Sequence, residues 1–185
     1  MTVTRNLTAL VVASPVGPLT LVAGVAGLEH IIFGDERPAE AADPGGRAAR
    51  ILSQAQRQLV EYFGGERRSF DLPLDPQGTP FQLAVWRLLG EIPYGETITY
   101  GEQARRLGRL GAARAVGAAN GRNPLPIVVP CHRVVGADGS LTGYGGGLPK
   151  KRWLLEHEAT HARRLATPPD LFAGTAREGS RRAPR

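Results

Sequence analysis

The chain has 185 residues, of which 42% are hydrophobic and 6% aromatic, and it carries a formal net charge of +6. This length fits one good-sized domain or two small ones, and no apolar run approaches the roughly 18 residues that a membrane helix requires. The only cysteine, Cys131, excludes an intramolecular disulfide framework and a thiolate metal cluster. Residues 1–30 lack the layout of a signal peptide, because the segment 14–18 is rich in proline and glycine. We therefore expect a cytoplasmic protein.

The first part of the chain alternates short apolar runs with turn residues. Such runs predict β-strands, and the proline- and glycine-rich segment 14–18 predicts the turn between the first two. A later stretch has apolar residues at helical spacing and stops at Gly64-Gly65. The expected elements are strands over 8–13, 19–24, 28–33 and 69–74, a polar loop over 35–46, and a helix over 47–63.

The second part is expected to be mainly helical. Thr79 and Thr99 are suited to cap helices, and Pro80 suits the first position of a helix. Two short helices joined by a glycine-containing turn fit a helix-turn-helix. Four helices are expected. The first begins at residue 80 and ends at 93–95, and the others cover 100–107, 112–119 and 148–157. The fold class is therefore α+β: a small N-terminal α/β domain with an antiparallel sheet over 1–78, a winged-helix-like helical domain over 79–161, and a disordered Arg-rich tail over 162–185.

Positive charge is concentrated in the middle of the chain. Residues 99–133 hold 6 arginines and 1 acidic residue, whereas residues 1–98 hold 8 basic and 11 acidic residues. A basic segment beside an acidic one indicates a polyanionic partner, nucleic acid first. The alternative is a compositional bias, since 21 of the 23 basic residues are arginine.

Cys131 lies in the sequence Pro130-Cys131-His132-Arg133. It is either a buried small hydrophobic residue or a nucleophile, with His132 as a candidate base and Arg133 as a cation that lowers the pKa of the thiol. In an extended segment, as expected here, neighbouring side chains point to opposite sides, so direct contact between Cys131 and His132 would be awkward.

The second helix of the expected pair, residues 112–119, is made almost entirely of alanine and glycine. Arg114 is its only long side chain. Such a helix either packs tightly in a core or lies against DNA with one arginine projecting. It cannot read many base edges, because it lacks the side chains that do so. Sequence-independent DNA binding is the function that it would suit.

Several motifs together resemble one family. Asn123-Pro124, the Pro-Cys-His-Arg-Val run from residue 130, the glycine-rich loop 143–147 and the segment 153–158 resemble the O6-alkylguanine-DNA alkyltransferases, which repair DNA by direct reversal. The resemblance is continuous from about residue 79 to 158 and weaker in the N-terminal part. It implies transfer of the alkyl group from O6-alkylguanine, and less well from O4-alkylthymine, to Cys131 in a single turnover after base flipping.

The resemblance also implies roles for individual residues. Cys131 would be the acceptor, His132 the general base that acts on the thiol through a water, and Glu158 the residue that holds His132 in its useful tautomer. Without the resemblance, Glu158 would be interpreted as a solvated residue at a helix end. Asn123 would order the turn, and Tyr100 would donate a proton or hydrogen bond to the guanine. The remaining implied residues are Arg114, Ala112, Ala113, Gly117 and Tyr100 for DNA binding in the minor groove, and Val134, Tyr144, Gly145 and Pro126 for the substrate pocket.

No cofactor and no metal are expected. Some members of this family bind zinc through cysteines that this chain does not have, and its histidines show no ligand spacing. We expect a monomer in isolation that binds double-stranded DNA, with clustering on DNA left open, and no membrane partner. Two alternatives remain at this point: a non-catalytic lesion-binding protein, against which the presence of Cys131 argues, and a cysteine hydrolase that uses Cys131 and His132.

Overall fold

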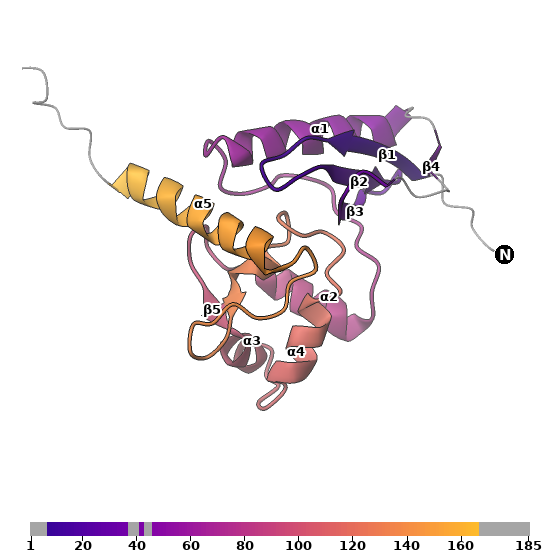
Figure 1. The fold of residues 1–185 in the computed structure, drawn as a ribbon. Coiled ribbons are helices and arrows are strands. Elements are labelled where there is room, and N and C mark those ends of the chain that lie inside the picture. Colours follow the sequence, from indigo (N-terminus) through magenta and orange to yellow (C-terminus); the bar gives the residue numbers. More distant parts are fainter. Residues whose placement is uncertain (1–6, 37–40, 43–45, 167–185) are drawn as a thin grey trace, which may run out of the picture.

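The structure is a computed structural model that describes residues 7–36, 41–42 and 46–166. Its N-terminal part is built on a sheet of order β3-β2-β1-β4 (Figure 1). The first three strands form an antiparallel meander in which Leu10 pairs with Leu21 and Leu21 with Ile31. The pairing of β4 with β1 is parallel, and it lies inside the segment expected to be a loop. The strands are β1 (Leu7–Val12), β2 (Leu19–Ala23), β3 (Leu28–Phe33) and β4 (Ala41–Ala42).

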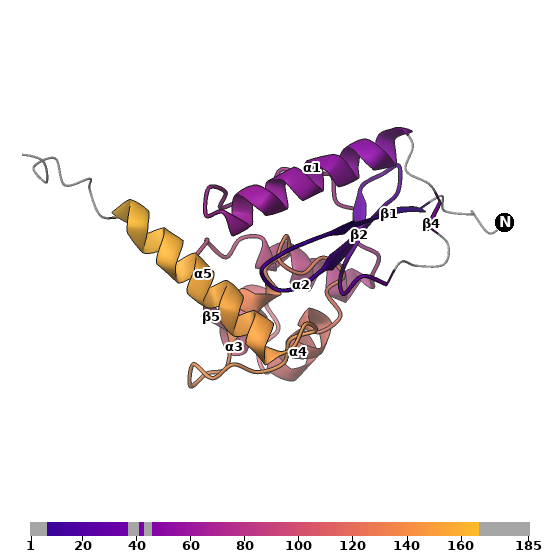
Figure 2. The same ribbon diagram turned by 45° about the horizontal axis from the view of Figure 1, so that its top comes forward.

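Helix α1 (Gly46–Phe63) covers one face of this sheet (Figures 1 and 2). Its apolar stripe, including Ile51, Leu52 and Leu59, is buried, and every residue of β2 is buried beneath it. Burial of one apolar face supplies most of the stability of such a helix. The three long strands and the helix are confirmed to within one or two residues.

The expected strand over residues 69–74 is wrong. The segment is a loop with a single bridge, between Leu74 and Leu28. Its backbone groups are satisfied elsewhere, since Gln54 and Gln58 of α1 both donate to the carbonyl of Asp71, and Gln58 also accepts from the Asp71 amide. A β-ladder is therefore not needed to satisfy these groups.

The second part contains four helices and a small two-stranded sheet. Thr79 caps α2 with a full capping box to Gln82, and Thr99 caps α3 through the Glu102 amide. The helix from residue 80 ends at Leu89, before the expected 93–95, with Gly90 as its C-cap. The elements are α2 (Pro80–Leu89), β5 (Ile98–Thr99), α3 (Tyr100–Arg106), α4 (Ala113–Asn120), the 3₁₀ turn η1 (Cys131–Arg133), β6 (Val134–Val135) and α5 (Leu148–Ala166).

Buried polar side chains fix α3 and α4 against α2. Gln103 donates to the carbonyl of Val85, and it exchanges hydrogen bonds with Asn120. The indole of Trp86 donates to the carbonyl of Ala119 at 2.9 Å. Paired polar groups in a core specify one arrangement, because an unpaired group there is costly. The short helix pair is therefore a rigid unit.

Helix α5 is longer than expected, and it reaches Ala166 instead of ending at His157. The predicted start of a disordered tail at residue 162 is therefore wrong, because no proline or glycine interrupts the chain between Pro149 and Pro168. Residues 167–185 lie outside the described residues. The expected α+β class, with an antiparallel sheet followed by a mainly helical part, is confirmed. None of the helices in the described ranges is long and apolar enough to cross a membrane.

Candidate active site

Cys131 lies in a 3₁₀ turn, so the expectation of an extended chain at this point is wrong. The Arg133 amide donates to the carbonyl of Pro130, which closes the turn. Just before it, Ile127 has a φ of 77°, a left-handed conformation that a β-branched residue rarely adopts. The chain therefore reverses sharply here and presents Cys131, which is 7% exposed. Adjacent side chains in a 3₁₀ turn still diverge, so His132 points away from Cys131.

Asn123 holds this reversal from the inside. Its side-chain amide donates to the carbonyl of Val129 at 2.7 Å, and its oxygen accepts from the Leu125 amide at 3.0 Å. The Val129 amide in turn donates to the carbonyl of Leu125. One asparagine side chain thus joins both ends of the strained segment.

Glu158 is fully buried, which excludes the alternative of a solvated residue at a helix end. Its two carboxylate oxygens accept hydrogen bonds from three different parts of the chain. The donors are the Tyr62 hydroxyl (2.8 Å), the Gly95 amide (3.0 Å), His132 Nε2 (2.9 Å) and Arg133 Nε and Nη2 (2.9 Å each). Burial raises the pKa of Glu158, but the hydrogen bonds and charges of its neighbours outweigh it and hold that pKa well below the ordinary range.

His132 is held in one tautomer by this carboxylate. An ionised carboxylate can only accept, so Nε2 of His132 carries the proton and Nδ1 is left with a free lone pair. Nδ1 is buried and has no hydrogen-bond partner among the described residues. Burial lowers the pKa of His132, against the opposing effect of Glu158. The imidazole is therefore neutral near pH 7 and has one nitrogen able to accept a proton.

Arg133 does not act on the thiol as the sequence suggested. Its guanidinium makes a bidentate pair with Glu158, and its Nη1 donates to the carbonyl of Ile92. A planar guanidinium fits a carboxylate in this way. Arg133 therefore compensates the buried charge of Glu158.

The cation close to Cys131 is Lys151, which sequence reasoning missed. Its ammonium is buried and donates to the carbonyls of Val134 (2.6 Å) and Thr142 (2.8 Å). Burial raises the pKa of the Cys131 thiol above its ordinary value. The Asn123 side chain and the charge of Lys151 offset this increase only in part. A lysine at the start of an amphipathic helix gives no signal of this role, because only the tertiary fold brings α5 to Cys131.

Cys131 opens into a cavity of about 300 Å³ at the junction of the two parts of the chain. Of the expected pocket residues, Pro126, Tyr144 and Gly145 line it, together with Asn123. Val134 does not, because it is buried in β6. The remaining lining residues are His30, Ile31, Ile32, Phe33, Asn120, Gly121 and Pro124. The N-terminal strand β3 was not expected to take part in the pocket.

Two tyrosines lie near the thiol. The Tyr100 hydroxyl donates to the carbonyl of Thr142 at 3.0 Å and does not line the cavity. The Tyr144 hydroxyl is buried without a hydrogen-bond partner among the described residues. Burial raises the pKa of both, so both hydroxyls stay protonated and able to donate.

Helix α4 presents Arg114 to solvent, while Ala112, Ala113 and Gly117 are half-buried. Much of the basic charge in the middle segment is already paired. Arg105 and Arg106 both contact Glu102, and their hydrogen bonds lower the pKa of that carboxyl to about 2. The arginines of this segment without an ion pair to any described residue are Arg109, Arg114 and Arg122.

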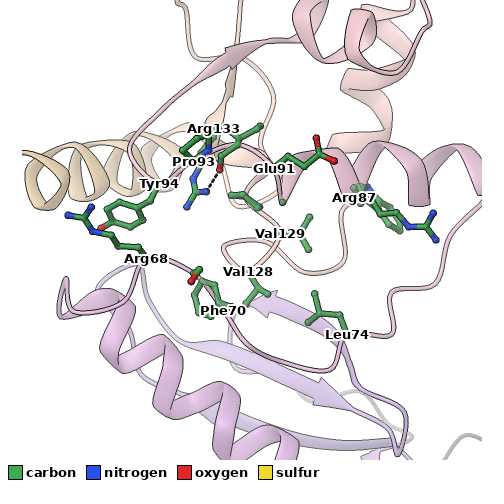
Figure 3. A pocket seen from close by; sticks show the side chains of 15 residues that line it. Arg68, Phe70, Leu74, Arg87, Glu91, Pro93, Tyr94, Val128, Val129 and Arg133 are labelled. Carbon is green, nitrogen blue, oxygen red and sulfur yellow. Dashed lines mark hydrogen bonds between the residues drawn. The ribbon is translucent and has the colours of Figure 1, made fainter.

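A second cavity, of about 380 Å³, lies behind the active-site turn (Figure 3). Val128, Val129 and Pro130, which precede Cys131, line it, and it opens between the loop after α1 and the end of α2. Arg68 and Arg133 lie on either side of Tyr94, at 5.6 and 5.7 Å from its ring centre. The guanidinium of Arg133 is paired with Glu158, so Arg133 offers no free charged group to this cavity. In the described ranges no three His, Cys, Asp or Glu side chains form a group that could hold a metal ion.

These features define a class: a protein with one buried thiol at a cavity, a neutral histidine oriented by a carboxylate, and a rigid helix pair whose second helix exposes one arginine. Family models of the 6-O-methylguanine DNA methyltransferases match both parts of the chain, the ribonuclease-like domain over residues 8–76 and the DNA binding domain over residues 80–160. The chain belongs to this family.

Named relatives agree with this assignment. The chain is 49% identical over 148 residues to a methylated-DNA–protein-cysteine methyltransferase of Methanosarcina acetivorans, covering 80% of this chain and 95% of the relative. It is 51% identical over 154 residues to that of Mycobacterium bovis, covering 80% and 90%. The crystal structure of the Mycobacterium tuberculosis O6-methylguanine methyltransferase matches with a TM-score of 0.76 at 46% identity, covering 89% of this chain and 97% of that one. A structure of the M. tuberculosis protein in complex with DNA matches at 0.75 and 47% identity, covering 84% and 94%.

Proposed function

We propose that the protein repairs DNA by moving the alkyl group of O6-alkylguanine onto Cys131. The observation that carries this proposal is the buried chain from Glu158 to His132 beside a lone thiol that faces a cavity. Such a chain prepares a base for one proton transfer. Family membership supplies the substrate class.

The reaction then proceeds as an in-line displacement. A water between His132 Nδ1 and the Cys131 sulfur carries the thiol proton to Nδ1, since the two side chains diverge. The thiolate attacks the alkyl carbon, the new S–C bond forms as the bond from that carbon to O6 breaks, and guanine leaves with the electron pair. Lys151 stabilises the thiolate, and hydroxyl donors at Tyr100 and Tyr144 stabilise the charge that develops on guanine. To do so, Tyr100 must release the carbonyl of Thr142.

The product of this reaction is a thioether, which has no route back to a thiol. The protein therefore acts once, and each molecule removes one lesion. O4-alkylthymine fits the same chemistry but presents a smaller base, so we propose it as a poorer substrate.

DNA binds through the helix pair α3–α4 in this proposal. The small side chains Ala112, Ala113 and Gly117 let α4 approach the minor groove, and Arg114 fills the stack that the flipped nucleotide leaves. Arg109 and Arg122 add phosphate contacts, so binding weakens as salt rises. We further propose a monomer that divides into two domains near residue 78, a boundary supported by the two family matches, and a cytoplasmic location, where the thiol stays reduced.

Successive additions of duplex DNA with one O6-methylguanine test this function. Methyl transfer should stop at one equivalent per protein, and fresh DNA should produce no further transfer. Continued turnover would indicate a cysteine hydrolase or another enzyme, and lesion binding without transfer would indicate a recognition protein.

A further inference from the structure

The edge strand of the N-terminal sheet forms one wall of the Cys131 cavity. β3 is an edge strand of the sheet, so the backbone groups on its outer edge can form hydrogen bonds with a loop. The Ile31 amide on that edge donates to the carbonyl of Pro124 at 2.8 Å, in the turn that Asn123 orders. Four consecutive residues of β3, from His30 to Phe33, line the cavity.

Phe33, the last residue of β3, supports the glycine-rich loop on the other side of the cavity. Its ring lies edge-on to the ring of Tyr144, with centroids 5.8 Å apart and planes at 61°. A Cβ placed on Gly146 would lie 2.6 to 2.9 Å from three atoms of the Phe33 ring, so the loop backbone rests directly on it. The ammonium of Lys150 lies 5.7 Å from the centre of the same ring.

We propose that Phe33 determines which alkyl groups the site accepts, by holding the loop with Tyr144 and Gly146 close to Cys131. This inference rests on the proposed function, since it concerns the size of the group that the thiol receives. Tyr144 and Gly145 face the cavity together with Cys131. When the ring of Phe33 is removed, the loop loses its support and the wall gains space. A larger alkyl group then fits between the loop and the sulfur.

A merely structural role predicts a different result. If Phe33 only contributed to packing, its loss would slow transfer of small and large alkyl groups by the same factor. A specificity residue changes the ratio of the two rates, because the free-energy change depends on the group in the pocket. The ratio of rates for a benzyl and a methyl group therefore distinguishes the two roles.

The experiment measures single-turnover rates on one duplex that carries either O6-methylguanine or O6-benzylguanine. Phe33→Ala should raise the benzyl-to-methyl ratio at least about fivefold, and Phe33→Leu should give an intermediate ratio. Phe63→Ala is the matched control, because Phe63 is a half-buried phenylalanine of the N-terminal part that packs on Trp153 and His157. Its ratio should equal that of the wild type.

An unchanged ratio in Phe33→Ala would overturn the inference. If Phe33→Ala melts below the assay temperature, Phe33→Leu decides alone, by an increased or an unchanged ratio. Failure of the proposed function looks different, because the wild-type protein would then transfer neither group.

Discussion

At the scale of single residues, Glu158 organises the site. One carboxylate accepts from Tyr62 on α1, from the backbone after α2, and from the turn that carries Cys131. The bidentate pair with Arg133 keeps it ionised, and that charge fixes the His132 tautomer. The orientation of His132 therefore depends on contacts between residues that are far apart in the sequence.

Glu158→Gln should slow methyl transfer by at least about tenfold, since a positioned base contributes a factor of about 10²–10⁴ to a rate.

Wild-type His132 cannot accept the thiol proton once it is itself protonated. Its pKa lies below the ordinary 6.5, so the rate should fall only as pH drops below about 6.5. Glu158 raises that pKa, so its loss should move the acid limb to still lower pH. Single-turnover rates against pH measure both effects, and an unchanged rate at pH 7 would contradict the assigned role.

Ile127 provides a test of backbone strain in the turn before Cys131. Its left-handed φ costs an L-residue about 1–2 kcal/mol, which glycine avoids at an entropic cost of about 0.5–1 kcal/mol. Ile127→Ala and Ile127→Gly should both lose stability, because a buried side chain is removed. The Gly variant should nevertheless be the more stable of the two, by about 0.5–1 kcal/mol, as measured by urea unfolding.

The matched pair for this test is Val116→Ala and Val116→Gly, at a buried position in helix α4. There alanine should be the more stable, as in any helix. If the order at residue 127 were the same as at residue 116, the strain would not be present in the native protein.

Among the helices, strands and turns, those that local sequence signals specify were predicted correctly. Those that depend on long-range contacts were not. Thr79, Pro80 and Gln82 specify the start of α2 through contacts within four residues, and this start is confirmed. The segment 69–74 has strand-like residues, but glutamines of α1 satisfy its backbone. The turn at Cys131 depends on Asn123, eight residues away, and on a strained Ile127, neither of which is visible as periodicity.

The same difference divides the site. Cys131 and His132 are adjacent in sequence, and motif resemblance pointed to Glu158. Tyr62 and Lys151 lie in amphipathic helices, and nothing in the sequence of those helices indicates that either residue belongs to a functional site. Only the packing of α1 and α5 around the active-site turn brings them there.

Arg114 on α4 allows binding to DNA to be separated from chemistry. Arg114→Ala should slow transfer from duplex DNA by about tenfold or more, because a flipped nucleotide costs a few kcal/mol that the inserted side chain helps to offset. Transfer from the free base O6-benzylguanine should keep its wild-type rate, since no flipping is required. Arg122→Ala, also outside any ion pair among the described residues, is the control for lost charge. Equal losses on the free base and on the duplex would contradict the insertion role.

At the scale of the whole molecule, the N-terminal part is a component of the site. It supplies Tyr62 to the Glu158 network and β3 to the cavity wall. The contact of His157 with the carbonyl of Tyr62 and the packing of Trp153 on Phe63 tie α5 to α1. Both matched domains therefore contribute residues to the candidate active site.

The segment 167–185 is expected to add phosphate contacts, because it carries 4 arginines and 2 acidic residues. Its deletion should weaken binding to undamaged duplex DNA and flatten the dependence of the logarithm of affinity on the logarithm of salt concentration, by about 0.9 for each lost contact. Methyl transfer at saturating DNA should be unaffected. Titrations at several salt concentrations measure the slope, and an unchanged slope would show that the segment makes no phosphate contacts.

We expect Cys131 itself to receive the alkyl group. The most direct measurement is the intact mass of the protein after incubation with duplex DNA that carries one O6-methylguanine, followed by peptide mapping, with Cys131→Ser in parallel. We predict a gain of one methyl group in place of one hydrogen, located on Cys131 and absent from the variant. An unchanged mass in the wild-type protein, or a methyl group on any other residue, would show that Cys131 is not the acceptor.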